Sequence, residues 1–382
     1  MPLNKPPDIP LAWPSYEQAE LEALQQVLHS RRWSVGPQLL ALEAECAALA
    51  GCRHGIGVNS GTIGLQIALE ALRIGAGDEV IVPAYTFVGS INAIVAAGAQ
   101  PVLVDIDRHS MNLDPSSVQA ALGPKVKAIM AVHLFGRLAP MHELSALAGA
   151  ANLRLIEDAC EAAGAQQAGQ SAGGLGDIGC YAFYPNKPIA AGEGGMLLTQ
   201  DADLALRCRQ LRNQGFDPAS GTYLDDHHGH SARLSEWHAA LARVQLQRLD
   251  KSLQQRAQVV EAYRARLSSD ARIELSPAAV GDQRIAWFTL PLRLRHDLAR
   301  HRDPLITELR RAGIGCNTYF TPIHHLPFHR GRYRQVELAV TEDIGSRCLA
   351  LPLHPAMTEA DIARVCDCLL QALDRLAADS GD

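Results

Sequence analysis

Residues 78–104 read DEVIVPAYTFVGSINAIVAAGAQPVLV, and this stretch decides the fold. Two short runs rich in β-branched residues, Glu79–Pro83 and Gln100–Val104, flank an apolar helical stretch near 88–97. Buried runs of this length on either side of a helix predict two parallel strands joined by a helical crossover. We therefore expect a strand–helix–strand unit at this point of the chain.

The same alternation continues around this unit, from residue 51 to about residue 200. Further strands are expected at 127–132, 153–156, 178–184 and 195–199, and a helix at 140–151. Alternating strands and helices of these lengths predict an α/β fold, with a mainly parallel sheet sandwiched by helices.

The pattern changes after Gln200. A helix is expected at 201–213, then a polar loop, and then a long helix from Arg233. The remaining chain, with a strand near 286–292, reads as a smaller α+β domain. Since 382 residues exceed the usual size of one domain, we expect a large α/β domain at 1–250 and a small C-terminal one at 251–382.

Composition excludes several classes of function. A formal net charge of −6 offers no basic surface for nucleic acid. No run of 18 or more apolar residues is present, so we expect no membrane span. The N-terminal residues do not read as a secretory signal. Nine scattered cysteines, an odd number, indicate reduced thiols and therefore a cytoplasmic protein.

Three segments have polar or charged residues near strand ends, at the edge where open α/β sheets bind ligands. Ser60, Gly61 and Thr62 precede a helical stretch, so backbone N–H groups could receive a phosphate there, although an ordinary helix cap has the same pattern. Asp158 follows the strand at 153–156 and could face the cleft, or serve as a solvated turn residue. Lys187 lies between an apolar strand and a glycine-rich turn, a position typical of a desolvated nucleophilic amine.

One aromatic residue follows the same logic. Phe87 comes shortly after a strand end and offers a flat ring that could stack on a cofactor. Packing in the core is an equally good interpretation of this residue.

In this order and context, these pieces resemble the sugar aminotransferases of the DegT/DnrJ/StrS group, from about residue 13 to residue 370. That group has the fold-type I pyridoxal-phosphate architecture, which implies a sheet of the seven-stranded type. The most specific stretches are NSGTIGLQIAL (59–69), DEVIVPAYTFVGSINAI (78–94), LIEDACEAAGA (155–165), GDIGCYAFYPNKPIAAGEGG (176–195) and GHSARLSEWHAAL (229–241).

The resemblance implies a role for each matching residue. Lys187 would hold pyridoxal 5′-phosphate as a Schiff base and move the proton, and Asp158 would pair with the pyridine nitrogen. The helix start with Gly61 and Thr62 would hold the phosphate, and Phe87 would stack on the ring. Arg233 would approach the site of a partner subunit, because the family builds its active sites across a homodimer interface.

Three positions depart from the family pattern. Ala182 stands where a phosphate-binding serine is usual, and Glu161 stands where glutamine often lies beside the cofactor's phenolic oxygen. Ser231 replaces the asparagine that reaches the phosphate from the partner subunit. Tyr319 and His324 match a segment near the active site, where substrate contact and ordinary packing are both open interpretations.

Two motifs resemble a dinucleotide-binding site and a metal site, but neither fits its context in the sequence. Residues 174–179 spell G-x-G-x-x-G, but this dinucleotide-binding pattern must follow a strand and open a helix, and here it precedes a strand. The Asp- and His-rich stretch 225–230 has no familiar zinc-ligand spacing. We therefore expect no nicotinamide cofactor and no metal.

The sequence thus predicts a cytoplasmic, pyridoxal-phosphate-dependent aminotransferase that carries an amino group from glutamate or glutamine to a keto group of a nucleotide-linked deoxysugar. The alternatives are the same fold acting on a keto-cyclitol or another keto substrate, and a cofactor-binding regulatory protein without turnover.

Overall fold

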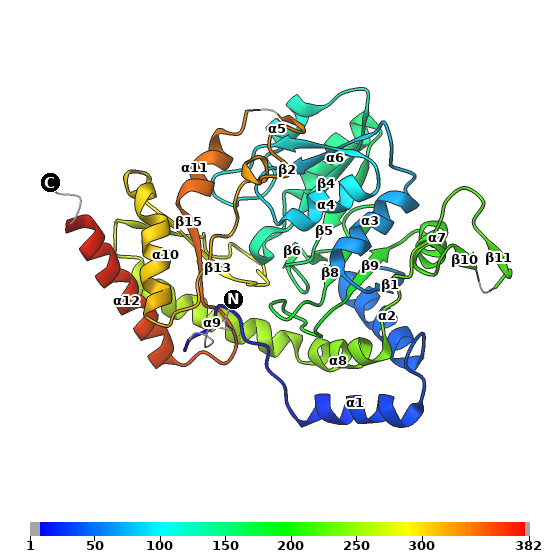
Figure 1. The fold of residues 1–382 in the computed structure, drawn as a ribbon, viewed down its shortest axis with the longest axis horizontal. Helices are drawn as coiled ribbons and strands as arrows, with labels where there is room; N and C mark the ends of the chain where they lie inside the picture. Colours follow the sequence, from blue (N-terminus) through cyan, green and yellow to red (C-terminus); the bar gives the residue numbers. More distant parts are fainter. Residues whose placement is uncertain (1–7, 218, 336, 379–382) are drawn as a thin grey trace.

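A sheet of eight strands, in the order β1-β9-β8-β5-β4-β2-β3-β14, forms the larger part of the molecule, to the right of β13 and β15 in Figure 1. The structure, a computed structural model, describes residues 8–217, 219–335 and 337–378. The strands of the sheet are β1 (His54–Val58), β9 (Gly195–Thr199), β8 (Ile178–Ala182), β5 (Arg154–Asp158), β4 (Val126–Val132), β2 (Glu79–Pro83), β3 (Gln100–Val104) and β14 (Arg334–Gln335).

Most neighbouring strands in this sheet are parallel. Every pair from β14 to β8 is parallel, whereas β9 is antiparallel to both β8 and β1. The mainly parallel sheet expected from the sequence is therefore confirmed. Two of its strands, β1 and β14, were not among those expected from the sequence; β14 has only two residues, which carry no strand signal.

The strands read as continuous apolar runs because both faces of the sheet are covered. In β2, Val80 and Val82 pack into the core on one face, whereas Ile81 packs into the core on the other. Side chains alternate between faces along a strand. A strand with two dry faces therefore needs apolar residues at consecutive positions.

Seven helices provide this cover. Side chains of three of them pack with Val80 and Val82: α3 (Gly61–Ala71), α4 (Val88–Ala96) and α7 (Ala202–Arg212). The opposite face is covered by α2 (Pro37–Ala50), α5 (Pro115–Ala121), α6 (Met141–Ala151) and α8 (Glu236–Gln247).

Helix α8 begins later than the sequence suggested. The expected start was Arg233, but Arg233 forms a β-bridge with Val58, and the side chain of Ser235 caps the helix by accepting the His238 N–H. A serine hydroxyl satisfies one of the free N–H groups at a helix start, so the helix begins at Glu236. Helix α1 (Gln18–Ser30) packs along α8 and lies at the bottom of Figure 1.

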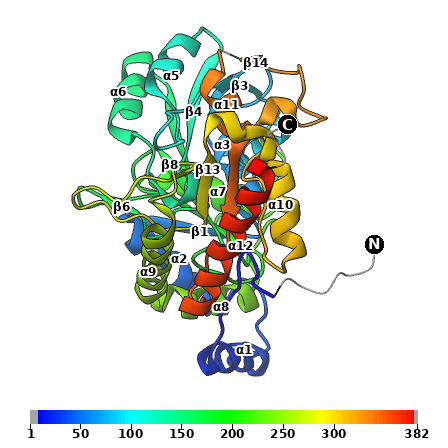
Figure 2. The ribbon, with the colours of Figure 1, turned by 90° about the vertical axis from the view of Figure 1, so that its left-hand side faces the viewer.

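The C-terminal part builds a second, smaller layer. Strands β12 (Ile273–Leu275), β13 (Leu290–Leu294) and β15 (Cys348–Leu351) form an antiparallel sheet. Helices α9 (Leu249–Leu267), α10 (Arg302–Arg311) and α12 (Glu359–Ala378) share its core, and α10 lies beside α12 (Figure 2). Ile9 also packs into this core and bridges to Ile314. A domain boundary at residue 250 stays a prediction.

The remaining elements are short. They are α11 (Ala339–Arg347), the strand pairs β6 (Gln166–Gln167) with β7 (Gln170–Ser171) and β10 (Phe216–Asp217) with β11 (Thr222–Tyr223), and the 3-10 turns η1 (Leu134–Gly136), η2 (His296–His301) and η3 (Ile323–His325). Among the described residues, no helix combines the length and the apolar character that crossing a membrane requires.

Candidate active site

A cavity of ≈ 680 Å³ lies at the carboxyl ends of the central parallel strands and extends under the C-terminal part of the chain. Nine of the residues singled out in the sequence line it: Ser60, Gly61, Thr62, Phe87, Asp158, Glu161, Ala182, Lys187 and Tyr319. These residues come from segments more than 250 positions apart. The fold therefore brings them together at the edge of the sheet where α/β enzymes bind ligands.

The start of α3 forms one end of the cavity. Ser60 is the N-cap residue, and its hydroxyl accepts a hydrogen bond from the Ile63 N–H at 3.2 Å. A Cβ atom added at Gly61 would lie 2.7 Å from Cys160 Sγ and 2.9 Å from Ala182 Cβ. Only glycine fits this close approach. The helix N-terminus therefore presents backbone N–H groups to the cavity, an arrangement that attracts a phosphate.

Asp158 is the last residue of β5 and is only 7% exposed. Oδ2 accepts a hydrogen bond from the Ser90 hydroxyl at 2.6 Å, and Oδ1 accepts one from the Cys160 N–H at 3.2 Å. Ser90 in turn lies 3.2 Å from the Thr86 hydroxyl. These contacts fix the orientation of a carboxylate that is available to the cavity.

Lys187 follows β8, the strand next to β5, so the lysine and Asp158 come from neighbouring strand ends. Its side chain is 12% exposed. Nζ lies 3.5 Å from Glu161 Oε1 and 4.1 Å from the centre of the Phe288 ring. The amine is thus held between a carboxyl group and an aromatic face, in a largely dry position.

Glu161 lies beside this amine and is 5% exposed. Burial raises the pKa of its carboxyl group, and the positive charge of Lys187 opposes that rise only in part. Oε2 accepts a hydrogen bond from the Phe135 N–H at 2.9 Å. Burial thus favours the neutral form of Glu161 more than in solution.

Aromatic rings line the wall that the C-terminal part supplies. Tyr319 stacks on Phe320 with ring centres 4.7 Å apart, and Phe320 lies 6.0 Å from Phe87. Burial raises the pKa of Tyr319, and the neighbouring Glu161 raises it further. Phe87 is 54% exposed, so its ring borders the cavity rather than filling the core.

Three of the residues singled out in the sequence do not line the cavity. Arg233 donates hydrogen bonds to Asn213 Oδ1 at 3.1 Å and to Ser231 Oγ at 3.0 Å. His324 directs Nε2 to Glu342 Oε1 at 2.5 Å. A role for Ser231 and Arg233 at a partner's site, and for His324 in substrate contact, stays a prediction.

Sequence reasoning missed several residues of the cavity. Ser90 lies within a quoted motif, but nothing local indicates that its hydroxyl reaches Asp158 from another strand end. Asn186 precedes Lys187, and its Oδ1 atom is buried without a hydrogen-bond partner among the described residues. Phe288 lies about a hundred positions after the lysine that it contacts. Only the folded chain reveals such pairs.

Residues 174–177 of the glycine-rich stretch form a bend that leads into β8, which begins at Ile178, so the stretch opens a strand rather than a helix, as the sequence predicted. The Gly176 N–H donates a hydrogen bond to Glu157 Oε1 at 2.7 Å. Glu157 is fully buried and also accepts hydrogen bonds from Gly173 and Leu175. The motif thus anchors the loop beneath Asp158.

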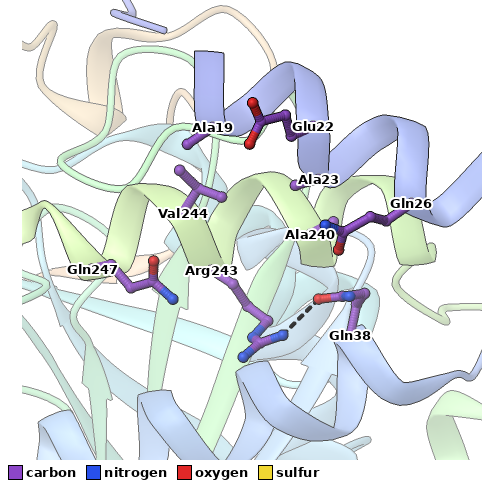
Figure 3. Close-up of a pocket in the computed structure, with 9 residues that line it drawn as sticks. All are labelled: Ala19, Glu22, Ala23, Gln26, Gln38, Ala240, Arg243, Val244 and Gln247. Carbon is purple, nitrogen blue, oxygen red and sulfur yellow. Dashed lines mark hydrogen bonds between the residues drawn. The ribbon is translucent and has the colours of Figure 1, made fainter. Parts of the chain in front are cut away.

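A second hollow of ≈ 190 Å³ lies between α1, α2 and α8 (Figure 3). Its side chains are small or polar, and Arg243 Nη1 donates a hydrogen bond to Gln38 Oε1 at 2.6 Å. It contains none of the candidate residues. The larger cavity is therefore the candidate active site.

The sheet order, together with a lysine and an aspartate on one cavity, defines an α/β enzyme of the fold-type I class. The chain belongs to the DegT/DnrJ/EryC1/StrS aminotransferase family, which it matches over residues 14–370.

Individual relatives agree with this assignment. The chain is 39% identical to GDP-perosamine synthase of Caulobacter vibrioides, over 89% of this chain and 91% of that protein. It is 37% identical to UDP-N-acetyl-3-dehydro-alpha-D-glucosamine 3-aminotransferase of Acidithiobacillus ferrooxidans, over 92% and 93%. Among solved structures, DesV of S. venezuelae in complex with a ketimine intermediate is similar, with a TM-score of 0.87, 34% identity and coverage of 96% and 98%. The chain is therefore similar to aminotransferases along nearly its whole length.

Proposed function

We propose that this protein transfers an amino group from glutamate or glutamine to a keto group of a nucleotide-linked deoxysugar, with pyridoxal 5′-phosphate as its cofactor. The observation that carries the proposal is the meeting of Lys187 and Asp158 on one cavity, beside the open N-terminus of α3. An amine, a carboxylate and an anion site in one place are the three groups that this cofactor requires.

The residues present fit the cofactor. Glycine at position 61 lets the start of α3 lie against Cys160 and Ala182, and Gly61 and Thr62 at this helix start line the cavity, where their N–H groups can receive a phosphate. Asn186 Oδ1, buried without a partner among the described residues, is a further polar atom that a ligand would satisfy. When bound, pyridoxal phosphate supplies an electron sink for the carbon that carries the transferred nitrogen.

Each residue then has a definite task. Asp158, oriented by the Ser90 hydroxyl, keeps a proton on the pyridine nitrogen. Lys187 Nζ accepts and returns the proton at the reacting carbon, and its dry position between Glu161 and Phe288 excludes competing water. The N–H groups of Gly61 and Thr62 hold the phosphate, with Ser60 fixing the helix start.

The substrates are proposed from the relatives and the cavity. The names of the relatives specify GDP- and UDP-linked sugars, so we propose a nucleotide-linked keto-sugar as the acceptor. A space of ≈ 680 Å³ is large enough for a sugar above a bound cofactor. Tyr319 and Arg233 are the proposed substrate contacts, Arg233 at a partner's site, whereas His324 lies outside the cavity with its ring directed to Glu342. A keto-cyclitol acceptor and a regulatory protein without turnover are the alternatives that the experiment below separates.

We also propose a cytoplasmic homodimer with shared active sites. Seven large apolar side chains with exposures above 40% are concentrated at the N-terminal end: Trp13, Tyr16, Leu21, Leu28, Trp33, Val35 and Leu40. Such a concentration on one region favours a protein interface. Ser231 and Arg233 lie outside this chain's own cavity and would then serve the partner's. All nine cysteines are free, which suits a reducing compartment.

The test compares the cofactor-loaded wild-type protein with Lys187→Ala. We expect glutamate to change the absorbance of the wild-type protein and a nucleotide keto-sugar to reverse the change. We expect Lys187→Ala to lower turnover more than about 100-fold, while Lys251→Ala, at an exposed lysine of α9, leaves it unchanged. Full turnover in Lys187→Ala would refute the assignment. Turnover with keto-cyclitols alone would favour the first alternative, and no response to any amino donor would favour the regulatory one.

A further inference from the structure

Two adjacent histidines converge on one carboxylate at the outer side of the cavity wall. His324 and His325 lie in η3, and Glu342 lies in α11. His324 Nε2 is 2.5 Å from Glu342 Oε1, and His325 Nε2 is 3.1 Å from Glu342 Oε2. The three potential ligand atoms all lie within 4.8 Å of one another. This is the one group of that kind among the described residues.

The arrangement is unusual for surface side chains. The side chain of His325 is 46% exposed and that of Glu342 is 48% exposed, and ion pairs at such positions contribute only about 0–1 kcal/mol to stability. Stability alone therefore gives little reason for two imidazoles to point at one carboxylate. Both rings direct the same atom, Nε2, to the same place, which is what coordination of a shared ion requires.

The three atoms lie near the spacing that a transition metal requires, although His324 Nε2 and Glu342 Oε1, now hydrogen-bonded at 2.5 Å, must separate to admit an ion. Zinc binds imidazole nitrogen and carboxylate oxygen with bonds of about 2.0–2.2 Å, so a tetrahedral ion holds its ligand atoms about 3.3 Å apart. Small side-chain rotations would bring the three atoms to that spacing. Two nitrogens and one oxygen favour zinc or a similar ion over magnesium, which prefers oxygen ligands in an octahedron.

We propose that His324, His325 and Glu342 form a binding site for a divalent transition metal of the zinc class, with a water molecule as the fourth ligand. The sequence led us to expect no metal in this chain and left substrate contact or packing open for His324. The fold brings these ligands together, since the short 3-10 turn aims both rings at a helix seventeen residues further along the chain. His324 Nδ1 is buried without a partner among the described residues, so the outer shell is incomplete and we expect moderate affinity.

The metal would connect the cavity wall to α11. Thr321 and Leu326, on either side of η3, both line the candidate active site. Binding of the ion would tie this segment to α11, which Asp105 already holds to the large sheet by accepting hydrogen bonds from the Val340 and Thr341 N–H groups at 2.8 and 2.7 Å. The site is therefore placed to stiffen one wall of the cavity without contacting the reacting atoms.

The experiment is a zinc titration of the full-length, cofactor-loaded protein after treatment with a chelator, in competition with a chromophoric zinc indicator. We expect one zinc ion per chain. We expect His325→Ala and Glu342→Gln each to weaken binding more than about tenfold, and zinc to raise the thermal midpoint of the wild-type protein but not of Glu342→Gln. Magnesium should not compete.

The chain offers a matched control. His227 and His228 are also adjacent and lie with ring centres 4.7 Å apart, but neither forms an ion pair with a carboxylate among the described residues. The double variant His227→Ala/His228→Ala should bind zinc as the wild-type protein does. The proposal is overturned if the wild-type protein binds no zinc, or if both His325→Ala and Glu342→Gln bind it unchanged, which would place the ion elsewhere, for example on thiols.

Discussion

A hydroxyl group added at position 182 should tighten cofactor binding. Ala182 ends β8, lines the cavity, and has its Cβ 2.9 Å from the point that a Cβ at Gly61 would occupy. In the Ala182→Ser variant, the new hydroxyl therefore lies beside the helix start that is proposed to receive the phosphate. A hydrogen bond to a charged group contributes about 1.5–3 kcal/mol. This corresponds to a roughly 10- to 150-fold gain in affinity.

The assay must isolate the phosphate contact from the covalent bond to Lys187. Apoprotein is therefore titrated with pyridoxamine phosphate, which forms no such bond, and separately with pyridoxamine, which lacks the phosphate. We expect Ala182→Ser to bind only the phosphorylated ligand more tightly, and Ala182→Val, which adds bulk without a donor, to show no gain. Equal affinities of Ala182→Ser and wild type for pyridoxamine phosphate would refute the reasoning, as would an equal gain for pyridoxamine.

Two further predictions concern buried polar groups. Ser90→Ala removes the 2.6 Å hydrogen bond to Asp158, so it should lower the free energy of unfolding in urea by about 1.5–3 kcal/mol and should also lower kcat. Ser90→Thr, which keeps a hydroxyl group, should retain the stability and the kcat of the wild-type protein. A fully active and stable Ser90→Ala protein would contradict this role. Burial lowers the pKa of His354 from 6.5 to about 4, and neither ring nitrogen has a hydrogen-bond partner among the described residues. As the pH falls from 6.5 to 4, the His354 ring therefore takes up a proton in the unfolded chain before it does so in the folded protein. The free energy of unfolding should fall across that window by about 2 kcal/mol after allowance for solvent screening. His354→Leu should flatten this part of the plot of unfolding free energy against pH, and an unchanged plot would contradict the prediction.

Much of the fold could be predicted because it depends on local patterns. The runs at Glu79–Pro83 and Gln100–Val104 became β2 and β3 with those bounds, since a strand buried on both faces must be apolar at consecutive positions. Features that depend on distant partners could not be predicted in the same way. β14 exists because Arg334 pairs with Val102, and Arg233 stays outside α8 because it pairs with Val58, so that the Ser235 cap sets the helix start. Neither pairing leaves a periodic signal in the sequence.

The residues of the candidate site also fall into those that local sequence could locate and those that depend on distant partners. Lys187, Asp158 and the helix start at Gly61 could be located because strand ends of a parallel sheet converge on one edge. Ser90 and Phe288 could not, because their importance comes from a contact across the fold rather than from their neighbours in sequence. The resemblance to the family places the segment around His324 near the cavity, but it does not tell where the side chain points. In the structure the His324 ring points to Glu342.

The three departures from the family pattern do not have equal physical consequences. Burial raises the pKa of Glu161 and favours its neutral form, and a protonated carboxyl group can donate a hydrogen bond, as the amide of glutamine does. Ser231 keeps a hydroxyl group, which Arg233 holds at 3.0 Å. Ala182 alone leaves a methyl group in place of a donor. We therefore expect a buried, neutral Glu161 to replace glutamine beside the ring, and we expect the N-terminus of α3 to supply more of the phosphate binding than it does in relatives that carry a serine at position 182.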